Sequence, residues 1–175
     1  MKRSIFLLTL IACFGTSFAI AQDEETEKTE TKRIAFFDMD NCEICNCMSD
    51  VKDMMQKVKW ETQIIPNGFL AITVVPEDLK ASMEKAKKKM KAAITKLEDG
   101  DEMTICGYCQ GLGDLIAEGA DLTELSTVGG DIMMVTSSDE DVVKKIQAHA
   151  KKTIAEHKKM MEQMMKEQAK SGRKG

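Results

Sequence analysis

The chain has 175 residues, of which 31% are charged and only 5% are aromatic, and its formal net charge at pH 7 is −4. This acidic balance argues against a general nucleic-acid-binding protein, which needs a basic surface to displace the counterions of the phosphate backbone. A single Trp, a single Tyr and two Pro argue against an all-β sandwich.

The first 21 residues have the pattern of an export signal. Lys2 and Arg3 precede an apolar run over 5–11, which is too short to cross a bilayer as a helix of the mature protein. Ala19-Ile20-Ala21 fits the small-x-small pattern before a signal-peptidase cut, so we expect residues 1–21 to be removed. The net charge then falls to −6, because the segment holds two basic residues and no acidic one. The mature protein is expected in the periplasm or outside the cell.

A second cleavage site competes with the first. Leu10-Ile11-Ala12-Cys13 resembles a bacterial lipobox, in which Cys13 would carry a lipid and anchor the protein to the outer envelope. The apolar residues that continue past Cys13 favour the cut after Ala21. No later stretch is long and apolar enough to span a membrane.

The rest of the chain is expected to form one domain. Residues 22–33 are charged and lack apolar periodicity, which indicates a disordered acidic linker. Residues 34–165 are predicted to be the domain, and 166–175 a disordered basic tail.

Four landmarks within the domain recur in the same order, which indicates an internal duplication with halves at about 34–100 and 101–165. Cys42 and Cys45 precede Cys106 and Cys109 by 64 residues. Asn67-Gly68 precedes Gly129-Gly130 by 62. A Glu-Asp pair and a Lys-Lys pair each recur after 63 residues, at 77–78 and 140–141 and at 88–89 and 151–152.

Each half is predicted to fold as helix, strand, strand and helix. The first half has a short lead-in strand over 34–37, a helix over 49–58 capped by Ser49, strands over 60–65 and 69–75, and a helix over 77–97. The second half has a helix over 113–118, strands over 122–128 and 132–136, and a long helix from the capping box at 138–141. The residues at 67–68 and 129–130 should form the hairpin turns.

Because a lone hairpin is only marginally stable, the two hairpins should join into one antiparallel sheet. The sequence therefore predicts an α+β fold of two pseudo-symmetric repeats, with the helices on one face of the sheet.

Five cysteines remain after the expected cut, and an odd number cannot all pair within one chain. In the first interpretation, Cys42, Cys45, Cys106 and Cys109 converge on one soft transition metal, zinc or Cu(I). Cys47 is a substitute ligand, and His149, expected on the inward face of the last helix, is an additional one. Thioethers near the cysteines favour Cu(I). They belong to Met39, Met48, Met160, Met161, Met164 and Met165.

The sequence carries no Gly-rich phosphate loop, HExxH or GxSxG motif. The metal interpretation therefore predicts a binding protein without turnover, whose partner is a metal ion.

The second interpretation is a structural or interaction module of the cell envelope. An exported chain meets an oxidising compartment, and a cross-link such as Cys42–Cys106 would join the two halves. Loop closure of this length stabilises a fold by about 3–4 kcal/mol.

The third interpretation rests on a resemblance. Ile34-Ala35-Phe36-Phe37-Asp38 followed by Cys42-x-x-Cys45 resembles the strand, CxxC and helix of thioredoxin-like oxidoreductases, which would make Cys42 and Cys45 a redox pair. The chain departs from that family afterwards, because a hairpin replaces the crossover unit and neither Pro66 nor Pro76 suits the family's cis-proline.

A second resemblance covers about residues 59–160. The segments 66–75 and 136–150 resemble a loosely defined group of exported bacterial proteins with two such repeats. The group has no established activity, so this likeness implies only the fold and export. The distance between the two cysteine clusters decides among the interpretations, because sulfurs on one metal lie within about 4 Å of one another.

Overall fold

The computed structural model describes residues 35–171. The predicted signal, its two cleavage sites and the acidic linker lie outside the described residues. The described elements, in chain order, are η1 (Cys45–Lys57), β1 (Lys59–Ile65), β2 (Gly68–Val74), η2 (Glu77–Leu79), α1 (Lys80–Glu98), α2 (Gly107–Ala117), β3 (Asp121–Thr127), β4 (Gly130–Thr136) and α3 (Glu140–Ser171).

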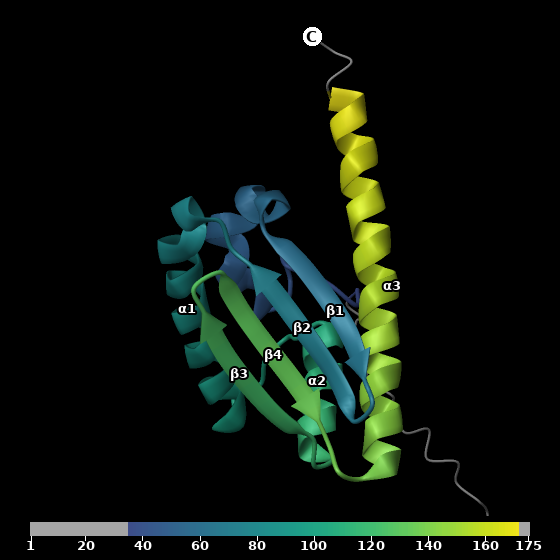
Figure 1. Ribbon diagram of the computed structural model, residues 1–175. Coiled ribbons are helices and arrows are strands. Elements are labelled where there is room, and N and C mark those ends of the chain that lie inside the picture. The colour runs from purple at the N-terminus through teal and green to yellow at the C-terminus, as the bar shows by residue number, and fades with distance from the viewer. Residues whose placement is uncertain (1–34, 172–175) are drawn as a thin grey trace, which may run out of the picture. The chain divides into compact units, whose positions relative to one another are not determined.

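The four strands form one antiparallel sheet in the order β1-β2-β4-β3. Each hairpin therefore supplies one inner and one edge strand, and the halves meet where β2 pairs with β4 (Figure 1). Ala71 pairs with Met133 at the centre of this ladder, and each is the middle residue of its strand. This symmetric register is what a duplicated hairpin is expected to give.

Helices cover one face of this sheet, which confirms the predicted α+β fold. Phe69 of β2 and Val135 of β4 are fully buried on that face, where they pack against Leu115 of α2 and Ile146 of α3. At the other end of the sheet, Met83 and Ala86 of α1 pack with Val51 of η1 and with the residues that follow β2. None of the described helices is long and apolar enough to cross a membrane.

Glycine is required at two equivalent positions, the first residues of β2 and β4. A Cβ on Gly68 would lie 1.9 Å from the carbonyl oxygen of Val135, and one on Gly130 would lie 1.8 Å from that of Thr73. Non-bonded heavy atoms do not approach this closely. Only glycine at these two positions therefore allows β2 and β4 to pair over their full length. The two halves therefore have glycine at equivalent positions for the same steric reason.

The hairpin turns lie one residue earlier than predicted. The two-residue loops are Pro66-Asn67 and Val128-Gly129, because Ile65 already pairs with Gly68 and Thr127 with Gly130.

The strands were predicted to within one or two residues, whereas several helices differ from prediction. The 49–58 segment is a 3-10 helix that begins at Cys45 without a side-chain cap. Asp139, rather than Ser138, caps α3, since its Oδ1 accepts hydrogen bonds from the backbone N–H groups of Asp141 and Val142. Helix α3 also continues to Ser171, into the predicted basic tail, and residues 35–37 form no strand.

Candidate metal centre

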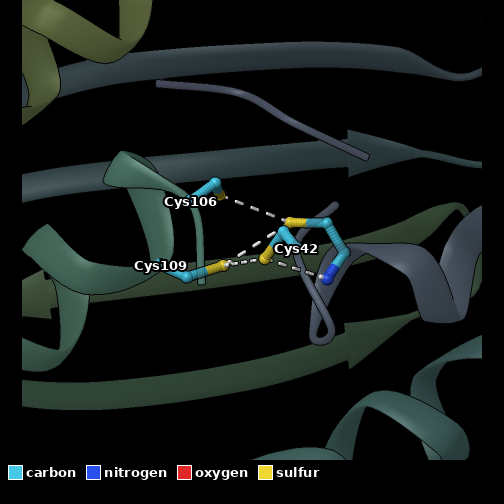
Figure 2. Close-up of side chains that lie close together, drawn as sticks. Cys42, Cys106 and Cys109 are labelled. Atoms are coloured by element: carbon cyan, nitrogen blue, oxygen red, sulfur yellow. Dashed lines mark hydrogen bonds between the residues drawn. The ribbon is translucent and has the colours of Figure 1, made fainter. Parts of the chain in front are cut away.

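The two cysteine pairs occupy matching places, each at the start of a helix. Cys42 lies in the loop before η1, and Cys45 is the first residue of η1. Cys106 directly precedes α2, and Cys109 lies in its first turn. Figure 2 shows the side chain of Cys109, from the second pair, directed toward that of Cys42, from the first.

Backbone hydrogen bonds hold these segments together. The N–H of Glu43 donates to the carbonyl of Thr104 (2.9 Å), and the N–H of Thr104 donates back to the Glu43 carboxylate (2.8 Å). The N–H groups of Gly107 and Tyr108 donate to the carbonyls of Ala35 and Phe36. These bonds satisfy two free amides at the start of α2, which has no side-chain cap. They also fix the second cysteine pair against the first half of the chain.

The loop before Cys42 is shaped by Asp38. Its Oδ1 accepts hydrogen bonds from the backbone N–H groups of Asp40 and Asn41, and its carbonyl accepts one from Cys42. The hydrogen bonds from Asn41 lower the pKa of the Asp38 carboxyl. An ionised Asp38 therefore organises the turn that brings Cys42 to the centre.

Four sulfurs form a compact group. The Sγ atom of Cys45 lies 3.5 Å from that of Cys109 and 3.7 Å from that of Cys106, and the Cys42 and Cys109 sulfurs lie 3.8 Å apart. All four sulfurs lie within 4.8 Å of one another. Four Zn–S bonds of about 2.3 Å in a tetrahedron separate the sulfurs by about 3.8 Å. The arrangement is compatible with metal binding.

The centre is shielded from solvent. Cys42 and Cys106 are fully buried, whereas Cys45 and Cys109 are partly exposed. Ile44, Met90 and Tyr108 are among the side chains that pack around them. Among the described cysteines every thiol is free, because even the 3.5 Å contact is far longer than an S–S bond of about 2.05 Å.

The thiols interact strongly with one another. Hydrogen bonds from Cys109 and Cys45 lower the pKa of the Cys106 thiol far below its usual range. The same contacts with Cys106 raise the pKa of Cys45 and of Cys109. Because these thiols contact one another, a cation is needed before all of them can ionise together.

Comparison with family models, with curated proteins and with solved structures finds no match to this chain. The assignment of the site therefore depends on its own geometry.

Two predicted site residues are not members of the four-sulfur group. Cys47 lies two residues after Cys45 in η1, where its Sγ is 3.6 Å from the carbonyl oxygen of Glu43. His149 lies among aromatic rings, with its ring centre 5.4 Å from that of Tyr108 and 5.7 Å from that of Phe36. Its Nε2 is buried with no hydrogen-bond partner among the described residues, and burial lowers the pKa of its imidazole.

The methionines next to the first cluster belong to the core. Met48 is buried with Val51 and Met83, and Met39 packs against the same cluster. These two thioethers therefore contact apolar side chains of the core, and the preference for Cu(I) stays a prediction. Of the terminal four, Met161 and Met165 are exposed on α3.

Sequence reasoning missed the residues that hold the two pairs together, such as Glu43 and Thr104. One of their bonds joins backbone atoms and the other joins the Thr104 N–H to the Glu43 carboxylate, and no spacing marks contacts across about sixty residues in a single sequence.

Proposed function

We propose that the mature, exported protein binds one transition-metal ion through Cys42, Cys45, Cys106 and Cys109, and that it does so without turnover. The observation that carries this proposal is the set of sulfur–sulfur distances, 3.5, 3.7 and 3.8 Å, which match the edges of a tetrahedron around a metal.

Zinc is the ion that this donor set suits best. Four thiolates in a tetrahedron are typical of Zn(II) or of iron–sulfur chemistry. Cu(I) was favoured by the thioethers near the first cluster, but Met48 is packed into the core. Zinc bound by four thiolates needs no further ligand, so Cys47 and His149 stay outside the coordination sphere.

The absence of turnover follows from the closed donor set. Catalytic zinc keeps one position for water or substrate, whereas four protein thiolates fill all the positions of a tetrahedral ion. The metal would instead join the start of η1 to the start of α2 and so link the two halves of the domain. Binding of this kind contributes directly to the free energy of folding.

The test is intact-mass and metal analysis of the protein purified from its native compartment without added metal. We expect one metal ion per chain, lost on acidification together with the uptake of protons by the thiols. Two disulfides and no metal would contradict the proposal and support the cross-linked envelope module. A single reversible disulfide between Cys42 and Cys45 would support the redox interpretation.

A pair of variants makes this test specific. Cys106→Ser should lower the metal affinity at least about 100-fold, because it removes one of the four proposed thiolate ligands. Cys47→Ser is the matched control, since it removes a nearby thiol of the same helix region, and its stoichiometry and affinity should equal those of the wild type. Equal losses in the two variants would contradict the proposed ligand set.

A further inference from the structure

The face of the sheet opposite the helices is apolar. Side chains alternate along a strand, so the neighbours of the buried Phe69 and Val135 point away from the helices. The inner strands place four large apolar residues there, paired as Leu70 with Met134 and Ile72 with Ile132. Leu125, the partner of Ile132 on β3, and Val74 extend the same surface and are 47% and 45% exposed. We call these six residues the outer face.

The outer face has no cover among the described residues. None of its six residues belongs to the hydrophobic clusters that the helices form with the sheet. Figure 1 shows the sheet with α1 and α2 on its far side and the near side open. An antiparallel sheet with one solvated face normally alternates apolar and polar residues. Strands β2 and β4 instead carry apolar residues on both faces, as strands do that are buried on both sides.

We propose that the outer face packs against the outer face of a second copy of this chain. Four seven-residue strands span about 23 by 19 Å. The sheet faces of two copies therefore have a combined flat area of about 900 Å², which does not include the additional surface of the projecting side chains. Specific interfaces begin at about 1,000 Å² in total, so a face of this size lies at the lower limit and suits a reversible dimer, not a permanent one.

The charges at the rim also suit self-association. The outward positions of the edge strands carry Lys59 and Glu61 on β1 and Asp121 on β3. The rim of the outer face thus carries both positive and negative side chains, and its centre carries no charged residue. Two copies can therefore pair about a two-fold axis without a partner of opposite charge. An anionic membrane surface would instead require a basic rim.

After the expected cut at Ala21, the remaining terminal segments of the chain are poor alternatives. Residues 22–33 and 166–175 are composed almost entirely of charged and other polar residues, so they have no apolar side chains of the size needed to cover the outer face.

The test is sedimentation velocity of the mature full chain in reductant, from about 1 µM to about 1 mM. We expect a shift from monomer to dimer with a midpoint in the micromolar range. Leu125→Lys should move this midpoint at least about 30-fold, because a two-fold interface buries the new charge twice.

Leu122→Lys is the matched control. Leu122 lies on the same strand, is 41% exposed and points to the opposite face, so its substitution should leave the midpoint unchanged. Far-ultraviolet circular dichroism establishes that both variants are folded. A chain that stays monomeric throughout, or equal effects of the two substitutions, would overturn the proposal. So would a monomer that binds lipid vesicles through Leu125.

Discussion

At Cys106, contacts with two neighbouring thiols favour the charged form of the sulfur. Hydrogen bonds from Cys109 and Cys45 lower the pKa of Cys106, while the pKa values of Cys45 and Cys109 are raised by the same contacts. The raised pKa values favour the protonated thiols of Cys45 and Cys109 at neutral pH. A metal ion that binds all four sulfurs must displace those protons.

This proton release predicts a steep pH dependence of metal affinity. Lower pH favours the protonated thiols of Cys45 and Cys109, so the dissociation constant should rise as the pH falls, by at least about 100-fold per unit for two protons between pH 6 and 8. Competition titrations with a chromophoric chelator at several pH values measure this slope. An affinity independent of pH over that range would contradict binding through thiols that start protonated.

The sequence identified the four central cysteines because CxxC spacing and the repeat both pointed to them. It could not separate them from Cys47, which has the same chemistry and lies two residues from Cys45. Cys47 is separated from the four-sulfur group by the direction in which its side chain leaves η1. That direction depends on the 3-10 helix, which the sequence did not predict. His149 was correctly expected to face inward, but the rings of Phe36 and Tyr108 surround it.

Among the elements, α2 departs most from its prediction. The sequence indicated a helix only from Gly113, because glycines at 107, 111 and 113 lower its helix propensity. The helix begins at Gly107 because the carbonyls of Ala35 and Phe36 accept its first free amides. Hydrogen bonds to a distant segment thus stabilise the start of α2, where the local sequence has low helix propensity.

Two glycines of α2 give a matched pair of predictions. A Cβ on Gly111 would lie 2.7 Å from Nδ1 of His149, whereas a Cβ on Gly113 would have no heavy atom within 4 Å. Gly113→Ala should therefore raise the free energy of unfolding by about 0.5–1 kcal/mol through helix propensity.

Gly111→Ala should lower that free energy by about 1–2 kcal/mol, because overpacking against His149 exceeds the gain in propensity. Urea denaturation of the two variants and the wild type measures both changes. Stabilisation by Ala at both positions would show that the imidazole moves aside without cost.

At the scale of the whole molecule, two hairpins share one sheet and two cysteine pairs share one centre. The recurring landmarks predicted a single antiparallel sheet, the α+β class and the meeting of the clusters, since equivalent points of two halves can approach near a common axis. They could not predict the contacts in which the halves differ. Helix α3 packs with α2 and the inner strands, whereas the equivalent helix α1 packs with η1. Those depend on packing that no local pattern encodes.

Because the proposed metal joins the two halves, its removal should destabilise the entire domain. At free metal 100-fold above the dissociation constant, binding stabilises the folded state by about 2.7 kcal/mol. Thermal unfolding with and without a chelator should show a lower midpoint in the chelator. Cys106→Ser serves as the control, because its midpoint should not respond. An unchanged wild-type midpoint would mean that the metal does not support the fold.

X-ray absorption spectroscopy at the metal edge tests the central claim most directly, with mature protein purified from its native compartment. If Cys42, Cys45, Cys106 and Cys109 hold one zinc ion, the spectrum will show four sulfur neighbours at about 2.3 Å and no nitrogen or oxygen in the first shell. Fewer sulfurs with added nitrogen or oxygen, or no bound metal and a disulfide between the halves, would contradict it.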